Sequence, residues 1–176
     1  MNFDFSDDQK SLKDQARKFL SDKASSKVTR RVLDDAGVSY DEGLWRAVAE
    51  MGWLGAAIPE EHGGLGLGRL ELCVLAEELG RALAPIPFSS TAYFFAEALM
   101  LAGSDTQKAA LLPKVAAGEI IGCFASSEGP GAPTPSSIQA KFEGAALNGV
   151  KIPVTDGACA SHAVVVAQDS GAPASS

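Results

Sequence analysis

The sequence predicts an α+β protein in which an all-helical segment, residues 1–118, precedes a shorter segment of β-strands, residues 119–176. Apolar residues recur at helical spacing as far as Gly118. After Glu119 the pattern changes to short runs of branched and aromatic residues, separated by stretches rich in glycine and proline. Helices and strands that are segregated along a chain favour this class over alternating β/α units.

Composition and charge exclude several classes of protein. The 176 residues are 46% hydrophobic and 21% charged, which is typical of a globular chain. A net charge of -7 argues against a surface for nucleic acid or for an anionic membrane. No apolar run reaches the ~18 residues needed to span a bilayer.

The cysteines and histidines also limit the function. Three widely separated cysteines and only two histidines occur, so we expect reduced thiols and no metal site. The acidic N-terminal residues resemble neither a signal peptide nor a transit peptide. Together these features predict a cytoplasmic protein.

Helix caps indicate where several of the predicted helices begin. Ser6 with Gln9 and Ser104 with Gln107 fit the capping box, in which each side chain bonds the other residue's backbone N–H. Asp41 is a third predicted cap. Six helices are predicted within the ranges 6–20, 21–39, 41–52, 69–83, 91–101 and 104–118.

Some of these helices carry a further feature. Residues 91–101 are apolar nearly all round, so we expect that helix to be buried between other helices or against a second domain. Pro113 predicts a kink or a first-turn position in the last helix. Glu77 and Glu78 are adjacent in the fourth helix, and a solvated acidic face is the simplest interpretation of the pair.

The β segment is predicted from a few short runs. Strands are expected at 120–124, 138–142 and 163–167, with a hairpin over 145–154 that turns at Asn148-Gly149. The tail after residue 167 is expected to have no packing power. About four strands are too few to close a barrel or a sandwich and hide its edges. We therefore expect a β domain that is incomplete in this chain or is finished by a partner.

The stretch from Ile58 to Gly68 joins two predicted helices and has the sequence Ile-Pro-Glu-Glu-His-Gly-Gly-Leu-Gly-Leu-Gly. Its glycines predict a rigid loop that other backbone approaches closely. The stretch does not fit the dinucleotide-binding fingerprint, because no strand precedes it. A plain connection between helices, with no ligand, explains the loop equally well when it is taken alone.

This loop resembles the Pro-Glu-Glu-x-Gly-Gly-x-Gly loop of the flavin-dependent acyl-CoA dehydrogenases. Three more stretches resemble that family in the same order: Glu77-Glu78-Leu79, Leu112-Pro113-Lys114 with Gly118-Glu119, and Asn148-Gly149-Val150-Lys151. Family members have an N-terminal helical domain, a middle β-barrel domain and a C-terminal four-helix domain. The resemblance implies that residues 1–118 correspond to the first domain, that residues 119–176 are an incomplete middle β-barrel domain, and that the third has no counterpart here.

The resemblance implies FAD as cofactor, although both flavin motifs depart from the family's pattern. The family's Leu-Thr-Glu-Pro-Gly-x-Gly-Ser-Asp becomes Ser126-Ser127-Glu128-Gly129-Pro130, and Pro133-Thr134-Pro135 replaces the Gly-Ser-Asp. The family's Trp-Ile-Thr-Asn becomes Pro153-Val154-Thr155-Asp156, which lacks the aromatic residue that packs on the flavin. The cofactor-binding residues implied by the resemblance are Phe124, Ser126, Ser127, Val154 and Thr155.

The resemblance also implies a reaction, the α,β-desaturation of an acyl-CoA thioester. In the family a glutamate of the C-terminal domain removes the α-proton, and the β-hydrogen leaves as hydride to the flavin. No residue of this chain is therefore assigned as the catalytic base. Glu78 is expected to bind substrate at the end of the acyl-chain pocket, and the expected assembly is a homo- or hetero-tetramer of related subunits.

Three hypotheses stay open at this point. The chain is part of an FAD-dependent acyl-CoA dehydrogenase and is inactive by itself, or it is a non-catalytic partner subunit with a degenerate flavin site, or it is a helical binding module without cofactor. The ordered motifs favour the first hypothesis. Pro153 and the missing Gly-Ser-Asp favour the second. The third leaves the order of the motifs to chance.

Overall fold

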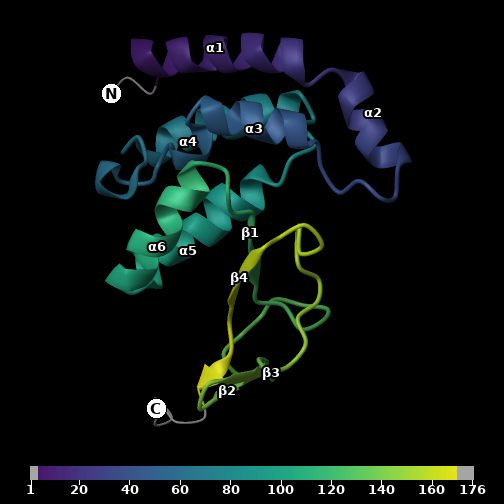
Figure 1. Cartoon of the computed structure of the whole chain (residues 1–176), viewed down its shortest axis with the longest axis vertical. Helices are drawn as coiled ribbons and strands as arrows, with labels where there is room; N and C mark the ends of the chain where they lie inside the picture. The colour runs from purple at the N-terminus through teal and green to yellow at the C-terminus, as the bar shows by residue number, and fades with distance from the viewer. Residues whose placement is uncertain (1–3, 170–176) are drawn as a thin grey trace.

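The helices form one end of the molecule and a small three-stranded sheet lies at the other, with a two-stranded sheet next to the helices (Figure 1). The structure is a computed structural model that describes residues 4–169. Within residues 4–169 all α-helices precede the first strand along the chain, so the predicted α+β class is confirmed. The expected domain boundary between residues 118 and 119 stays a prediction.

The helical body contains six α-helices within the described residues. Their bounds are α1 Asp7–Lys23, α2 Ser26–Asp34, α3 Glu42–Glu50, α4 Arg69–Arg81, α5 Ala96–Ala102 and α6 Asp105–Ala116. Two short 3-10 turns, η1 Trp53–Gly55 and η2 Glu60–His62, lie between α3 and α4, and a π-helical segment, η3 Ser89–Phe95, leads directly into α5.

The predicted caps are confirmed. Ser6 Oγ accepts a hydrogen bond from the Gln9 backbone N–H at 3.2 Å, and Gln9 Oε1 accepts one from the Ser6 N–H at 3.0 Å. Ser104 and Gln107 form the same reciprocal pair before α6. Asp41 Oδ1 accepts the N–H of Leu44 at 2.8 Å and so begins α3.

One expectation about the later helices is wrong, and one of the two alternatives for Pro113 is excluded. Phe94 and Leu101 are 55% and 73% exposed, so the apolar segment 91–101 is not buried all round. Its other face is buried, because Phe95 and Leu99 pack in the core and η3 lies against the first strand. Pro113 lies in the interior of α6 and not in its first turn.

The glycine-rich loop between α3 and α4 folds back tightly on itself. Leu65 and Leu67 donate backbone hydrogen bonds to the carbonyls of Gly55 and Ala56, at 2.9 and 2.7 Å. A Cβ on Gly64 would lie 2.0 Å from the Ile58 carbonyl oxygen, so only glycine fits there. The close approach of backbone predicted for this loop is confirmed.

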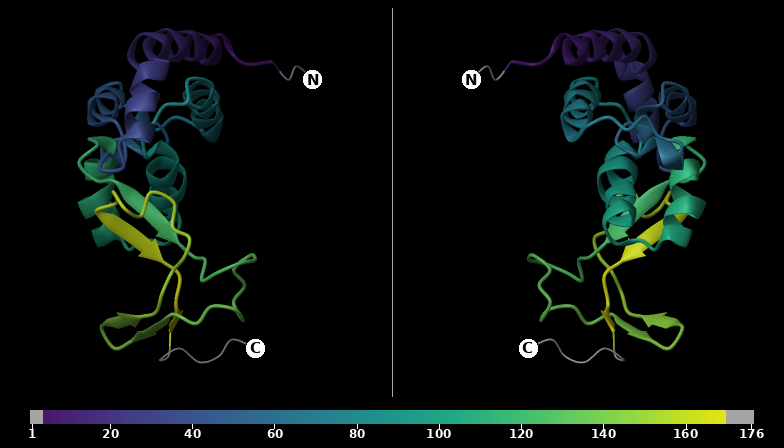
Figure 2. Two further views of the ribbon diagram at one scale, coloured as in Figure 1. Left: turned by 90° about the vertical axis from the view of Figure 1, so that its right-hand side faces the viewer. Right: turned by 90° about the vertical axis from the view of Figure 1, so that its left-hand side faces the viewer.

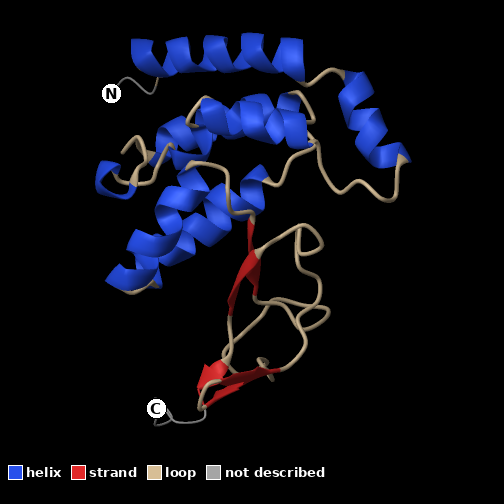
Figure 3. Cartoon of the chain, viewed as in Figure 1, coloured by secondary structure: helices blue, strands red, loops and turns tan. Residues whose placement is uncertain are grey.

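Two small sheets follow the helical body (Figures 2 and 3). Strands β1 Gly122–Ala125 and β4 His162–Val165 pair in parallel, with Phe124 opposite Val164. The second sheet has the order β3-β2-β5. Its strands are β2 Lys141–Glu143, β3 Ala146–Asn148 and β5 Gln168–Asp169.

The hairpin forms at a different place from the predicted one. Strands β2 and β3 are antiparallel, with Phe142 opposite Leu147, and the chain turns at Gly144-Ala145 instead of Asn148-Gly149. Gly144 has a φ of +64°, which suits a tight turn. Residues 150–154 form no strand of their own. Gln168 and Asp169 pair with β2, so the expectation that the tail makes no packing contact is wrong at these two positions.

The first sheet is held on the helical body. Thr91 Oγ1 of η3 accepts the N–H of Gly122 at 3.1 Å and donates to the Gly122 carbonyl at 3.3 Å. A Cβ on Gly122 would lie 2.1 Å from the ring of Phe95, so the strand sits directly on the helix. Ile120 and Ile121, just before β1, belong to the helical cores. The start of β1 is therefore fixed by helical packing.

Candidate functional site

The two stretches predicted to face a flavin lie side by side. The chain that continues from β1 runs beside residues 151–153, because the Ile152 N–H donates to the Ser127 carbonyl at 2.8 Å. A parallel bridge pairs Glu128 with Ile152. The structure therefore brings together two motifs that are more than twenty residues apart along the chain.

The ion pair of Lys151 and Glu128 lies next to this junction. Lys151 Nζ is 2.6 Å from Glu128 Oε1 and donates to the Ser126 carbonyl at 3.2 Å. Glu128 also accepts the backbone N–H groups of Gln139 at 2.5 Å and Ala140 at 2.9 Å. The hydrogen bond from Lys151, followed by those from the two backbone groups, lowers the pKa of Glu128 to about 2.

Phe124, Ser126 and Ser127 form the first part of the candidate site. The ring of Phe124 is stacked with that of Phe94 in η3, at a centroid distance of 6.5 Å and an interplanar angle of 24°. All three residues are half-buried. Within residues 4–169 the hydroxyls of Ser126 and Ser127 make no hydrogen bond, so both are free to contact a ligand.

Val154 and Thr155 follow the adjoining stretch. Val154 is half-buried and its carbonyl accepts the N–H of Gly157 at 3.2 Å, while Thr155 is exposed. Pro153, which stands where the family has an aromatic residue, is exposed. These residues begin a turn that leads on to β4.

The donor groups fit the ring end of a flavin better than its phosphate end. Free hydroxyls and an aromatic face suit an isoalloxazine edge, which has several hydrogen-bond acceptors. The loop 129–137 uses its polar groups on itself, because Ser137 Oγ accepts the Thr134 N–H at 2.9 Å and Thr134 Oγ1 contacts Ser136 Oγ at 3.1 Å. The cavity beside this loop holds only about 160 Å³.

Glu78 lies in a different environment. Its side chain is completely buried between α1 and α4, and Arg17 and Arg81 bind its two carboxylate oxygens. The hydrogen bond from Arg17 is the main reason that the pKa of Glu78 falls to about 2, and burial opposes that shift. The interpretation of a solvated acidic pair is wrong for Glu78, whereas Glu77 is 52% exposed and pairs with Lys13. The substrate-binding role expected for Glu78 stays a prediction.

Sequence reasoning missed the partners of these residues. Nothing local indicated that Glu128 would pair with Lys151, that Glu78 would bind Arg17, or that Phe94 would stack on Phe124. Each contact joins residues at least 23 positions apart. A search for opposite charges within matched motifs would have found only the Glu128–Lys151 pair.

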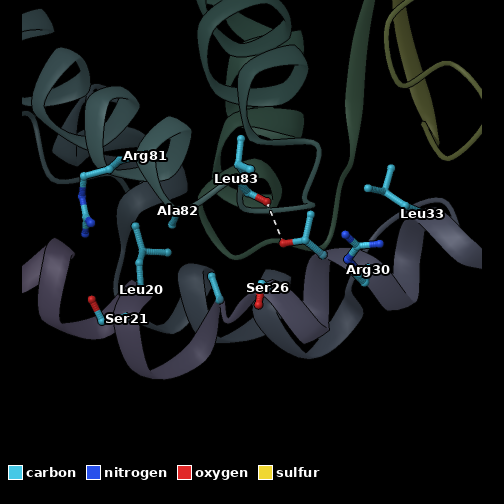
Figure 4. Close-up of a pocket in the computed structure, with 10 residues that line it drawn as sticks. Leu20, Ser21, Ser26, Arg30, Leu33, Arg81, Ala82 and Leu83 are labelled. Atoms are coloured by element: carbon cyan, nitrogen blue, oxygen red, sulfur yellow. Dashed lines mark hydrogen bonds between the residues drawn. The ribbon is translucent and has the colours of Figure 1, made fainter.

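A cavity of about 580 Å³ lies apart from the candidate site, between α1, α2 and the end of α4 (Figure 4). Thr29 of α2 donates to the Leu83 carbonyl at 3.1 Å across its edge. Leu20, Ala24 and Ala82 contribute apolar lining. It contains none of the predicted flavin-facing residues.

Metal and disulfide chemistry are not indicated in the described part of the chain. Among residues 4–169, no group of three or more His, Cys, Asp or Glu side chains is placed to hold a metal ion. Cys73, Cys123 and Cys159 are free, and burial raises the pKa of the Cys123 thiol. None of the helices described here is both long and apolar enough to cross a membrane.

Comparison with known proteins decides the family. The family model described as "Acyl-CoA dehydrogenase, N-terminal domain" matches residues 6–119. The chain belongs to the acyl-CoA dehydrogenase family. This confirms the resemblance drawn from the four motifs.

Individual relatives extend the match beyond the helical body. The mitochondrial isovaleryl-CoA dehydrogenase of Solanum tuberosum is 32% identical over 171 residues, which is 93% of this chain and 41% of the relative. A variant of the Tcur3481–Tcur3483 steroid ACAD is 35% identical, with a TM-score of 0.81, and the match covers 93% of this chain and 45% of that one. The ChsE4–ChsE5 complex of Mycobacterium tuberculosis is 26% identical, with a TM-score of 0.82, over 97% of this chain and 46% of that one.

The chain thus spans less than half the length of these relatives. Flavin is present in the fold family, since a glutaryl-CoA dehydrogenase from Mycobacterium smegmatis is known in complex with FADH2. That protein is 24% identical, with a TM-score of 0.77, over 94% of this chain and 44% of its own, so the likeness concerns the fold alone.

Proposed function

We propose that this chain contributes the flavin-facing and acyl-facing surfaces of an FAD-dependent acyl-CoA dehydrogenase. The observation that carries the proposal is the hydrogen bond from Ile152 N–H to the Ser127 carbonyl, which joins the two flavin motifs. The family match supports it, because both the family model and the isovaleryl-CoA dehydrogenase of Solanum tuberosum align with this region of the chain. The reaction is the α,β-desaturation of an acyl-CoA thioester.

Each predicted cofactor-binding residue has a defined part in this proposal. When bound, FAD supplies the acceptor for the hydride that leaves the β-carbon. Ser127 presents its hydroxyl to the polar edge of the ring, Ser126 offers main-chain groups, and Thr155 presents its hydroxyl from the adjoining stretch. Phe124 and Val154 cover apolar parts of the flavin ring, and the ring of Phe94 stacks against that of Phe124.

The proposal assigns no catalytic base to this chain. A general base must be free to reach a substrate proton and must have a pKa suited to the transfer. Glu78 and Glu128 have pKa values of about 2, and their carboxylates are occupied by arginine or by lysine and backbone N–H groups. The chain is therefore proposed to be inactive by itself and to act within a larger protein or assembly.

A second candidate is a non-catalytic subunit that completes a heteromeric acyl-CoA dehydrogenase. It is favoured by the exposed Pro153 in place of an aromatic residue and by the loop 129–137, whose hydroxyls bond one another. The match to the ChsE4–ChsE5 complex is consistent with mixed assemblies in the family. A homo- or hetero-tetramer and a cytoplasmic location accompany both candidates as predictions.

An FAD titration of the purified chain separates the two candidates. We expect saturable quenching of flavin fluorescence by the wild-type chain. Ser127→Ala should weaken binding about tenfold, because one hydrogen bond to the ring is lost. Ser136→Ala, which removes a hydroxyl bonded within the loop, serves as the matched control and should bind like the wild type. No binding by the wild-type chain would contradict the first candidate and leave the second.

A further inference from the structure

Glu128 connects three separate parts of the β segment. Glu128 follows β1 along the chain. Its carboxylate accepts hydrogen bonds from the backbone N–H groups of Gln139 and Ala140, just before β2, and from the ammonium group of Lys151. The distances are 2.5, 2.9 and 2.6 Å. One side chain therefore fixes the positions of segments that are separated by more than ten residues on each side.

The surroundings of the pair make this connection rigid. The side chains of Lys151 and Glu128 are only 8% and 13% exposed, although the residues of the nearby strands β2 and β3 are exposed. Hydrogen bonds to a charged group are shorter and stronger than neutral ones, and water does not compete well at a shielded site. Lys151 also donates to the Ser126 carbonyl, so the pair reaches the flavin-facing stretch directly.

We propose that Glu128 is the positioning residue of the flavin site, because its carboxylate fixes the distance between the Ser126-Ser127 stretch and the Ile152–Thr155 stretch. This inference rests on the function proposed above. Glu128 acts through Lys151 and the neighbouring backbone and does not touch the reacting atoms. Its place in the sequence, directly after Ser127, hides this role, since the motif suggests a residue that contacts the cofactor.

The geometry distinguishes this role from that of a simple ion pair. A simple pair needs only opposite charges at positions 128 and 151, so exchanging the two residues would preserve it. The contacts observed need two oxygen acceptors at position 128, because two backbone N–H groups point at the carboxylate. A lysine there has no acceptor, and a glutamine has one oxygen in place of two.

Amide hydrogen exchange in the flavin-free full chain tests the structural part of the inference. Glu128→Gln should speed exchange at Gln139, Ala140 and Ile152 by about tenfold or more, since charged hydrogen bonds are lost. Lys151→Met keeps the carboxylate and should affect Ile152 more than the other two amides. In the double variant Glu128→Lys with Lys151→Glu, none of the three amides should regain its protection.

Glu119→Gln is the matched control, because Glu119 is exposed and its side chain makes no hydrogen bond or ion pair within residues 4–169. This change also removes one negative charge, near the start of the β segment, and should leave hydrogen exchange at the three amides unchanged. Unchanged exchange at all three amides in Glu128→Gln would overturn the inference. Full protection of the three amides in the double variant would also overturn the inference, because it would show that Glu128 acts only as one partner of an ion pair.

The spectrum of bound FAD tests the positioning part. Wild-type chain and Glu128→Gln are each saturated with FAD, and the visible circular dichroism of the flavin is compared. We expect an altered flavin signal and about tenfold weaker binding in Glu128→Gln, with helical circular dichroism unchanged. An unaltered flavin signal and affinity, alongside faster exchange, would overturn the positioning role. Absence of FAD binding by the wild type would instead overturn the first candidate function and, with it, the flavin role of Glu128. The exchange data would still decide whether Glu128 holds the three segments together.

Discussion

Arg17 in α1 and Glu78 in α4 form a two-contact ion pair that joins the first helix to the rest of the helical body. Arg17 Nη2 lies 2.7 Å from Glu78 Oε1, and Nε lies 3.1 Å from Oε2. The Glu78 carboxylate is fully buried. The side chains of Arg17 and of Arg81, the second partner of Glu78, are 47% and 45% exposed. Ala16 and Leu20 of α1 are buried in the main core next to this contact.

Replacing Glu78 should therefore destabilise the helical body. Glu78→Gln removes the charge and retains the shape, and we expect the free energy of unfolding to fall by about 1–3 kcal/mol. Urea denaturation followed by tryptophan fluorescence measures the change. Glu77→Gln, at the adjacent half-exposed position, should cost about 0.5 kcal/mol or less, as for an exposed ion pair. Equal losses in the two variants would contradict the role assigned to Glu78.

The same ion pair predicts how stability depends on pH. The pKa of Glu78 is lowered from 4.5 to about 2 in the folded protein, so the folded state favours the ionised carboxylate. Its contribution is present in full above about pH 4.5 and is lost as the pH falls toward about 2. The stability difference between the wild type and Glu78→Gln should thus narrow below pH 4.5 in a series of urea titrations. A difference that stays constant down to pH 2 would show that the charge does not stabilise the fold.

Gly122 should be intolerant of even one methyl group. In Gly122→Ala the new Cβ would lie 2.1 Å from the Phe95 ring, so the strand or η3 must move, and we expect a loss of about 1–3 kcal/mol. Gly80→Ala in α4 is the control, because no atom lies within 4 Å of its Cβ position. That change should stabilise the protein by about 0.5–1 kcal/mol through helix propensity. Thermal unfolding should give a lower melting temperature than that of the wild type for Gly122→Ala and a higher one for Gly80→Ala.

The stacked rings of Phe94 and Phe124 should be energetically coupled. Their centroids are 6.5 Å apart and both rings are partly exposed, so a double-mutant cycle with alanine should give a coupling of about 0.5 kcal/mol. Denaturation of the two single variants and the double variant provides the cycle. Strictly additive losses would mean that Phe94 does not support Phe124.

Local features of the fold were predictable from the sequence, because local physics determines them. The capping pairs Ser6–Gln9 and Ser104–Gln107 lie within one helical turn, so their spacing alone identifies them. The close packing around Gly64 was likewise indicated by the glycines of its own loop.

Features that depend on distant partners were not predictable. Asn148-Gly149 has a strong turn propensity, yet the chain turns at Gly144-Ala145, where Phe142 pairs with Leu147. Pairing of β2 with β5 on its other edge also fixes that register, and no local signal reveals it. Glu78 is buried because Arg17, 61 positions earlier, supplies the compensating charge.

Native mass spectrometry of the purified chain, incubated with FAD, is the sharpest test of flavin binding at the junction of the two motifs. We expect every chain, alone or within an assembly, to carry the added mass of one FAD. A lower fraction of chains carrying that mass in Ser127→Ala, but not in Ser136→Ala, would locate the cofactor at the junction of the two motifs. A wild-type chain that carries no flavin after this incubation would contradict the claim.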